Sequence, residues 1–582
     1  MPGREKEFVS PDGCGTMSGM KLERSTWSEA FSALDAALAA VLLAAAFSVR
    51  GAPWAALVGL VPLWGMARVA PEARAVRFGA ASAFAFWAVT LRWLTNVTVL
   101  GWLGLSAYCA LLVMPSVLFA NRWKGGPLGF ALGLAGIWWG MEWFRGWFGG
   151  GFPWNPLAAA MVPWTHLIQP AEWIGAYGVS ALVAFANALL AWPLTGGRRR
   201  RAMEEWLRGG GPDTPPPPLS RRCRIVDDTA WYLCLLALLP IVYLGFRQVL
   251  GLAIADKAGY DAFRESAPLR PVTVAMVQPS IPQDEKWVSS KVDMIYSRLA
   301  TLTRQAIAGP APAPDAVLWP ETAVPDDLLT SKRSMALASS LCRARGTPLV
   351  TGTLDTVLDE AAGTVAYYNA AALLDAQGRP AASYAKRHLV VMGEFVPLAR
   401  FIPAAWRRAL GIPPDITPGT AGGRFPLGPR GAEVPAAPLI CFEDLVASLA
   451  RRDVADGARL LVNLTNDAWF DDALAPMQHM RAAALRAVEN RVPLLRAANT
   501  GVTCAIDRTG RVTALLRDGA TGRTADAGVL RATVLAPPDG MRLTFYTRFG
   551  NIGGVPCAAA TALWLLAGWF RNRRKGRIPD IP

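Results

Sequence analysis

Three residues that could perform nucleophilic chemistry each stand at the end of an apolar, strand-like segment of this 582-residue chain. Cys441 follows the segment 437–440 and is itself followed by Phe-Glu-Asp. Glu321 ends the segment that starts at Ala316, and Lys386 lies in the run Tyr-Ala-Lys-Arg-His. We predict that this glutamate, lysine and cysteine form one catalytic centre.

A cysteine thiol attacks a carbonyl group only as the thiolate, so it needs a base or a positive neighbour. Glu321 can serve as that base, and Lys386 can stabilise the negative charge that develops on the oxygen of an ester or amide. Taken alone, a cysteine at the end of a buried strand is more often an inert small apolar residue. The combination of the three residue types favours the catalytic interpretation.

The segments around these residues alternate between strand-like and helical patterns. Residues 271–279 form a buried-strand pattern that proline stops, and helical periodicity follows over 289–308. The strand that ends in Glu321 is followed by a helical pattern over 331–345. This order predicts an α/β sandwich over residues 271–536, in which reactive groups collect where strands end.

The rest of the chain is strongly apolar: 52% of all residues are hydrophobic and 23 are tryptophan. Eight apolar segments approach the roughly 20 residues that cross a bilayer. The predicted order is a cytoplasmic tail (1–29), six transmembrane helices (30–194), a basic Gly/Pro-rich cytoplasmic linker (195–229), a seventh transmembrane helix (230–252), a connector (253–270), the catalytic domain (271–536), a connector (537–553), an eighth transmembrane helix (554–571) and a cytoplasmic tail (572–582).

The chain has a net charge of +15, and the positions of its basic residues predict an orientation in the membrane. Basic residues gather in the N-terminal tail and after the second, fourth, sixth and eighth segments, whereas the loops after the first, third and fifth are nearly bare of charge. The positive-inside rule then places both termini in the cytoplasm and the catalytic domain in the periplasm, if the organism is a bacterium with an inner and an outer membrane. Because the charge lies beside the apolar segments, no nucleic-acid partner is predicted.

Two further features of the sequence bear on partners. Arg198 to Arg201, in the linker, either signal topology or bind anionic lipid headgroups. Residues 1–29 lack an apolar core, so we expect the first transmembrane segment itself to direct insertion.

The cysteines and histidines indicate neither a metal nor a cofactor. Eight cysteines and three histidines show no metal-ligand spacing, so no metal site is predicted. Cys342 and Cys504 are candidates for a disulfide in an oxidising compartment, a pairing that the sequence leaves open.

Several motifs carry a resemblance to a known family. They are Trp319-Pro320-Glu321, the run from Tyr384 to Leu389, Gly393 to Pro397, Ile440 to Glu443, Asn466 to Phe470, and the loop from Gly151 to Pro156. The first four resemble the nitrilase, or carbon-nitrogen hydrolase, superfamily, whose members use Glu, Lys and Cys on a four-layer αββα sandwich. Together with the apolar segments, all six resemble the apolipoprotein N-acyltransferase family over nearly the whole chain.

The resemblance implies a multi-span α-helical membrane protein with an inserted nitrilase-like αββα domain. It implies a ping-pong reaction in which a cysteine takes an acyl chain from a membrane phospholipid and passes it to the α-amino group of the S-diacylglyceryl cysteine of an apolipoprotein. The alternative on the same fold is a membrane-tethered amidase that releases the acyl group to water. A transporter or scaffold with an inactive domain is disfavoured by the complete Glu, Lys and Cys set.

The resemblance also assigns roles to residues. It makes Glu321 the general base, Lys386 the oxyanion stabiliser and Cys441 the nucleophile. Glu394 and Glu443 match carboxylates that support these three. For Glu394, a salt bridge that orients Lys386 is an equally weighted interpretation.

Aromatic residues are the predicted substrate-binding groups. Trp287 matches an aromatic residue on a mobile loop, and Trp154, Trp469 and Phe442 complete the set. For the three tryptophans the alternative is anchoring at the membrane interface, which tryptophan favours. The chain departs from the family pattern at Phe442, where tyrosine is common, and at Ala385, where asparagine is common, so these changes bear on substrate packing more than on the reaction type.

Overall fold

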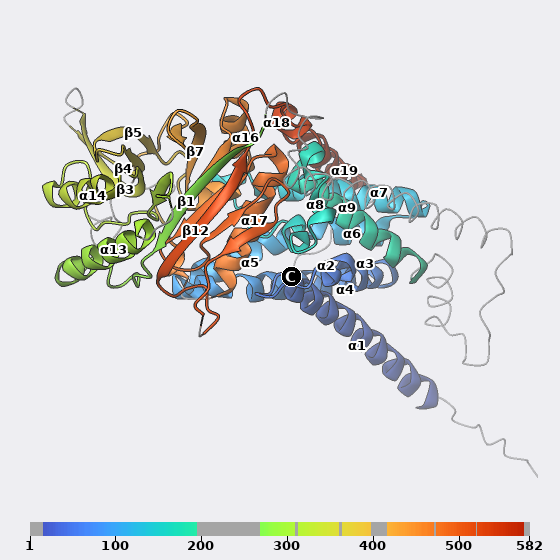
Figure 1. The fold of residues 1–582 in the computed structure, drawn as a ribbon. Helices are drawn as coiled ribbons and strands as arrows, with labels where there is room; N and C mark the ends of the chain where they lie inside the picture. Colours follow the sequence, from blue (N-terminus) through green and yellow to red (C-terminus); the bar gives the residue numbers. More distant parts are fainter. Residues whose placement is uncertain are drawn as a thin grey trace, which may run out of the picture.

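The protein consists of a helical part and an α/β sandwich (Figure 1). The computed structural model describes residues 15–194, 268–308, 312–359, 364–396, 416–470, 473–519 and 521–574. The predicted linker (195–229), the predicted seventh transmembrane helix (230–252) and most of the following connector lie outside these residues.

The sandwich contains two six-stranded sheets. The first sheet has the spatial order β12 (Gly528–Ala536), β1 (Arg270–Gln278), β2 (Ala316–Leu318), β3 (Leu349–Asp359), β4 (Thr364–Leu374) and β5 (Pro380–Ala385). The second has the order β11 (Val512–Leu515), β10 (Cys504–Ile506), β9 (Leu494–Ala498), β8 (Leu460–Thr465), β7 (Val434–Ile440) and β6 (Phe425–Leu427). The three central strands β1, β2 and β3 are parallel, as are β7, β8 and β9.

Helices cover the outer face of each sheet. The first sheet is covered by α13 (Val292–Ile307) and α14 (Lys332–Arg345), and the second by α16 (Ala447–Ala455) and α17 (Leu474–Asn490). The predicted αββα architecture is therefore confirmed.

Alternation along the strands explains why both faces of the first sheet are covered. In β1, Val272, Val274 and Met276 pack between the two sheets, while Ala275 and Val277 point outward to α13 and α14. Successive side chains of a strand point to opposite faces, so an unbroken apolar run needs a partner on each side.

The helical part contains the predicted apolar segments that the structure describes. Its main helices are α1 (Gly15–Ala46), α2 (Pro53–Val58), α3 (Leu60–Val69), α4 (Glu72–Thr90), α5 (Val99–Leu111), α6 (Met114–Arg122), α7 (Pro127–Arg145), α9 (Ala171–Leu194) and α19 (Gly554–Arg574). By length and apolar composition, three segments among the described residues are long enough to cross a membrane: Ser28–Ala46, Val99–Arg122 and Ala171–Pro193. The number of eight crossings stays a prediction.

The helices differ in detail from the sequence patterns. Helix α1 starts at Gly15, within the expected tail. The apolar residues 99–122, within the six helices predicted over 30–194, form two helices, α5 and α6, and Pro115 lies in the first turn of α6. Proline is tolerated there because its missing N–H would have no partner within the helix.

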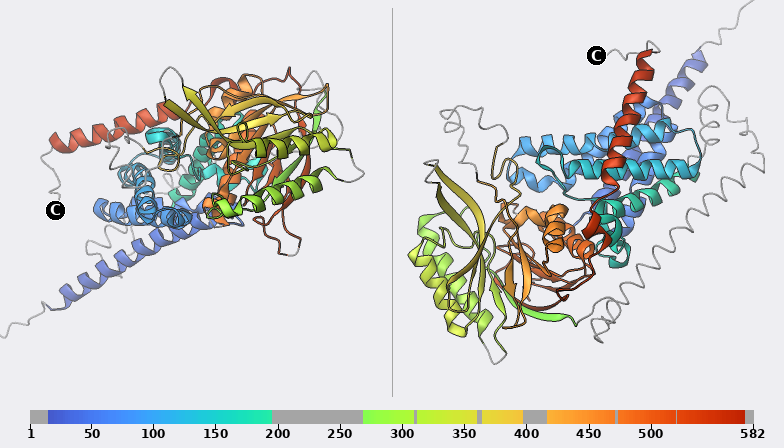
Figure 2. Two further views of the ribbon diagram at one scale, coloured as in Figure 1. Left: turned by 90° about the vertical axis from the view of Figure 1, so that its left-hand side faces the viewer. Right: turned by 90° about the horizontal axis from the view of Figure 1, so that it is seen from above.

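Helix α17 joins the sandwich to the helical part, as the right-hand view of Figure 2 shows in orange. Gln478 Nε2 donates to the carbonyl oxygens of Phe47 and Thr90, at 3.3 and 3.2 Å. Arg481 donates to the carbonyl oxygens of Ser48 and Val49, at 2.7 and 2.6 Å. One continuous apolar core also runs from the outer face of the second sheet into the helices. The loops after α1 and α4 are thus attached to the catalytic domain.

Candidate active site

Cys441 lies at the carboxyl end of β7 with a left-handed backbone, φ 50°. This conformation costs a non-glycine residue roughly 1–2 kcal/mol, so its surroundings must hold it. Asn463 Nδ2, on the neighbouring β8, donates to the Cys441 carbonyl oxygen at 2.9 Å. Cys441 is partly exposed, and the Thr465 side chain acts to lower the pKa of its thiol.

Glu321 lies three residues beyond the end of β2 and is buried. Gly352 on β3 permits its backbone to approach closely, because a Cβ atom there would lie 2.5 Å from the Glu321 Cα. The next residue, Thr322, has φ 40°. The backbone at Glu321 is therefore fixed by a close packing contact on one side and a strained residue on the other.

Lys386 directly follows β5, and its side chain is fully buried between two carboxylates. Its Nζ lies 3.5 Å from Glu321 Oε1 and 2.9 Å from Glu394 Oε2. Asn369 Nδ2, on β4, donates to both glutamates at 2.8 Å. We call Glu321, Lys386 and Glu394 the first-sheet cluster, since all three follow strands of the first sheet.

The charges of this cluster act on the cysteine. Although burial disfavours its ammonium form, Glu321 and Glu394 raise the pKa of Lys386 well above its ordinary value. Burial alone would raise the pKa of Glu394, but Lys386 and hydrogen bonds hold it below its ordinary value. Burial and the charge of Glu321 raise the pKa of the Cys441 thiol, against the opposing charge of Lys386. A raised pKa favours the protonated thiol, so a nucleophilic role of Cys441 would require a base.

Glu443, two residues after the cysteine, is fully buried and anchors the loop that carries Lys386. Its carboxylate accepts hydrogen bonds from Tyr384 Oη at 2.7 Å and from the backbone N–H groups of Arg387 at 2.7 Å and His388 at 3.0 Å. It also accepts from the N–H of Ile440 at 2.8 Å. Glu443 thus connects the strand end before Cys441 to the strand end before Lys386.

Lys286 belongs to this site, although the sequence did not single it out. Its Nζ donates to the Glu321 carbonyl oxygen at 3.1 Å and to Thr322 Oγ1 at 2.6 Å. Burial lowers its pKa to about 8, against the charges of Glu321 and Cys441. The feature of the sequence that could have revealed Lys286 is its position next to Trp287, a candidate substrate-binding residue.

The predicted aromatic residues have different surroundings. Trp154 is buried, donates from Nε1 to Gln478 Oε1 at 2.7 Å and stacks on Phe442 with 6.4 Å between ring centroids. Phe442 also stacks on His388. Trp287 and Trp469 are about half exposed. Substrate contact by these residues stays a prediction.

A second group of charged residues lies behind Cys441, entirely buried. It comprises Asp444, Asp467, His479 and Arg496, which we call the second-sheet cluster because they lie on or beside β7, β8, β9 and α17. Arg496 Nη1 lies 2.6 Å from Asp444 Oδ2, and Nη2 lies 2.9 Å from Asp467 Oδ2. His479 Nε2 lies 2.8 Å from Asp444 Oδ1, and Nδ1 lies 3.1 Å from Asp467 Oδ1. The signal that could have revealed this cluster is an arginine inside the apolar strand β9.

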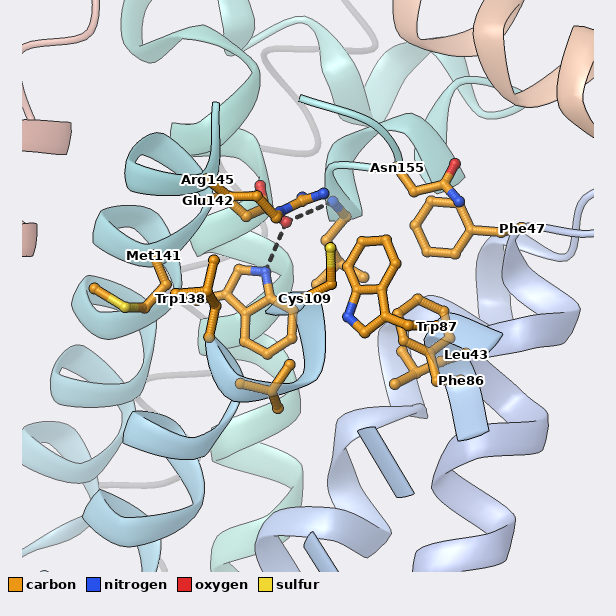
Figure 3. Close-up of a pocket in the computed structure, with 13 residues that line it drawn as sticks. Leu43, Phe47, Phe86, Trp87, Cys109, Trp138, Met141, Glu142, Arg145 and Asn155 are labelled. Atoms are coloured by element: carbon orange, nitrogen blue, oxygen red, sulfur yellow. Dashed lines mark hydrogen bonds between the residues drawn. The ribbon is translucent and has the colours of Figure 1, made fainter. Parts of the chain in front are cut away.

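Other features of the molecule lie away from this chemistry. A cavity of about 30 Å³ lies among α1, α4, α5 and α7, with Glu142, Arg145 and Asn155 at one side (Figure 3). A space of this size admits one or two water molecules and no acyl chain.

Among the described residues no group of His, Cys, Asp or Glu could hold a metal ion. Cys342 and Cys504 are free, buried and packed in different apolar clusters.

Known proteins resemble both parts of the chain. The model of the apolipoprotein N-acyltransferase N-terminal domain matches residues 39–189, and the carbon-nitrogen hydrolase model matches residues 273–534. An apolipoprotein N-acyltransferase of Geobacter metallireducens is 31% identical over 542 residues, which cover 91% of this chain and 94% of that protein. The chain belongs to the apolipoprotein N-acyltransferase family.

Other members of the family show the same extent of similarity. The apolipoprotein N-acyltransferase of Gloeobacter violaceus is 29% identical, over 96% of this chain and 99% of its own.

Among solved structures, an amidase from Nesterenkonia sp. is 18% identical with a TM-score of 0.31, covering 50% of this chain and 96% of its own. Saccharomyces cerevisiae Nit3, of the nitrilase superfamily, is 18% identical with a TM-score of 0.33, covering 45% and 90%. As a member of the apolipoprotein N-acyltransferase family, this chain is an acyltransferase and a bacterial membrane protein.

Proposed function

We propose that this enzyme transfers a fatty acyl chain from a membrane phospholipid to the α-amino group of the N-terminal S-diacylglyceryl cysteine of an apolipoprotein. The observation that carries the proposal is the meeting of Glu321, Lys386 and Cys441 at three strand ends in a chain of this family. No metal or cofactor takes part in the proposed steps.

In the first half of the reaction, the Cys441 sulfur attacks the ester carbonyl carbon of the phospholipid while Glu321 accepts the thiol proton. The carbonyl oxygen becomes an oxyanion, which the buried ammonium group of Lys386 stabilises more strongly than a cation in water would. The bond to the glycerol oxygen then breaks, and that oxygen takes the proton from Glu321. The products are a thioester on Cys441 and a lysophospholipid.

In the second half, the free amine of the diacylated lipoprotein attacks the thioester carbonyl carbon. Glu321 accepts a proton from the amine, Lys386 again stabilises the oxyanion, and the carbon–sulfur bond breaks. The leaving sulfur takes the proton, so the amide product forms and the Cys441 thiol returns. One site therefore serves both halves in turn.

The supporting carboxylates have structural positions that suit these roles. Glu394 lies 2.9 Å from Lys386 Nζ, so it holds the ammonium group and keeps it charged. Glu443 binds the two strand ends that carry Lys386 and Cys441. We therefore assign both to positioning of the catalytic groups.

The second element of the proposal is that the site faces the periplasm, beside the outer surface of the inner membrane. Support comes from the loops that the positive-inside rule places outside the cytoplasm, since those after α1, α4 and α7 contact the catalytic domain. A membrane-impermeant protease should cleave the 271–536 region in spheroplasts. Cleavage only in inside-out vesicles would reverse the orientation.

The transfer itself is tested with the full-length protein in vesicles that contain phosphatidylethanolamine and a synthetic diacylated lipopeptide. Mass spectrometry should find triacylated lipopeptide and lysophospholipid in equal amounts, and Cys441→Ala should abolish both. Free fatty acid without triacylated product would favour the amidase alternative. Unchanged turnover in Cys441→Ala would exclude a thioester on this residue.

A further inference from the structure

The second-sheet cluster is connected to the backbone of Cys441 and to Thr465, which lies at the neighbouring strand end. Arg496 Nη1 donates to Asn463 Oδ1 at 3.0 Å, and Asn463 Nδ2 in turn donates to the Cys441 carbonyl oxygen at 2.9 Å. Thr465 Oγ1 donates to Asp467 Oδ1 at 3.4 Å, and the Thr465 side chain acts to lower the pKa of the Cys441 thiol. Arg496 therefore reaches the Cys441 backbone through Asn463, and it reaches Thr465 through Asp467.

These contacts follow from the parallel pairing of neighbouring strands. Ile440, before the cysteine, pairs with Leu464, before Thr465, so the two residues leave their strands side by side at one edge of the sheet. Thr465 is fully buried, and Asp467 lies two residues further on. Asp467 cannot rotate freely, because Arg496 and His479 both bind its carboxylate.

We propose that Thr465 is a further catalytic residue, whose hydroxyl group hydrogen-bonds the Cys441 sulfur as it becomes a thiolate, and that Asp467 orients this hydroxyl. A threonine hydroxyl has one proton to donate and can also accept. In the resting enzyme the proton points to Asp467, and the hydroxyl oxygen can accept from the thiol. When Glu321 removes the thiol proton, the Thr465 proton turns to the sulfur, and no bond between heavy atoms forms or breaks. The proposal rests on Cys441 as the nucleophile.

Loss of the Thr465 hydroxyl group should make Cys441 harder to ionise. The groups whose charges act on its sulfur are Glu321 and Lys386 from the first-sheet cluster, Lys286 from the loop after β1, and Asp467. Loss of the hydroxyl leaves all four charges in place and removes one hydrogen bond to the thiolate. A hydrogen bond to a charged group corresponds to about a 10- to 100-fold effect on the equilibrium.

The test measures carboxamidomethylation of Cys441 by iodoacetamide between pH 6 and pH 10, with peptide mass spectrometry, in the purified full-length protein. In Thr465→Val we expect the rate profile to move to higher pH by about one unit and lipopeptide turnover to fall about 10-fold or more. Thr465→Ser should restore both, because it keeps the hydroxyl. Thr465→Ala is a second variant if the valine disturbs folding.

The matched control is Thr303→Val, which removes a buried threonine hydroxyl on α13 that accepts from Trp319 Nε1 at 2.9 Å. It should leave the alkylation profile unchanged. A Thr465→Val or Thr465→Ala profile that overlies the wild-type profile would overturn the inference while Cys441→Ala remains inactive. Full turnover in Cys441→Ala would instead contradict the proposed function itself.

Discussion

The two charged clusters on either side of Cys441 are built from the same kinds of residue but in different environments. The first-sheet cluster has two carboxylates and one lysine, and the carboxylate of Glu394 is partly exposed. The second-sheet cluster has two carboxylates opposite an arginine and a histidine, and its members are all at most 2% exposed. An incompletely balanced, accessible cluster can exchange protons with a substrate, whereas a balanced and sealed one holds geometry.

The histidine decides whether the second cluster is balanced. Burial and the neighbouring Arg496 act against protonation, yet Asp444 and Asp467 raise the pKa of His479 above its ordinary value. When His479 is protonated, its imidazolium and the guanidinium of Arg496 lie opposite two carboxylates, and the formal charges of this cluster cancel. A buried ion pair of this type contributes little net stability but is costly to break.

The largest effect on activity should come from the first-sheet cluster. We expect Lys386→Met to lower lipopeptide turnover by at least about 100-fold, because the oxyanion loses its cation. The thermal midpoint should change by only a few degrees, since one of the two carboxylates left behind can take up a proton. Activity and unfolding are measured on the same preparation.

The control for this variant is Lys291→Met, which removes a half-exposed lysine 3.6 Å from Glu285. Its turnover should equal that of the wild type. If Lys386→Met retained turnover within tenfold of the wild type, the role of Lys386 at the oxyanion would have to be abandoned.

Substitutions in the second-sheet cluster should mainly lower the free energy of unfolding. Arg496→Met leaves Asp444 and Asp467 buried without their strongest partner, and we expect a loss of about 3–5 kcal/mol in the free energy of unfolding. This loss of stability would be measured as a lower thermal midpoint in detergent and a lower yield of folded protein. Arg511→Met removes an exposed pair with Asp507 and should cost less than about 1 kcal/mol. Equal losses in the two variants would contradict the comparison.

The smallest expected effect is a change in pH dependence. Because the pKa of His479 is raised in the folded state, its stabilising contribution is complete below about pH 6.5 and is lost as the pH rises through the folded pKa. The wild-type thermal midpoint should therefore decline more steeply above neutral pH than that of His479→Gln. The control His166→Gln should keep the wild-type slope, and parallel curves for all three proteins would show that His479 does not titrate in this way.

The sequence indicated the candidate catalytic residues better than the residues that surround them. Glu321, Lys386 and Cys441 were found because each ends a recognisable strand, and parallel strands bring their ends to one edge. Asn369, which binds both carboxylates of the first-sheet cluster, lies inside a strand and gave no comparable signal. Trp154 was expected among substrate contacts or at the membrane interface, which stays a prediction; its burial against Gln478 and Phe442 could not be read from the sequence.

By itself, the sequence determined which segments are apolar helices, which are sandwich strands, and which side chains can react, because periodicity and functional groups are local properties. Only the tertiary structure decided how the charges pair. Asp444 and Arg496 lie 52 residues apart along the chain, and Trp154 and Gln478 lie 324 apart. Such pairs depend on sheet order and on the packing of α17 against the helical part, which no local pattern contains.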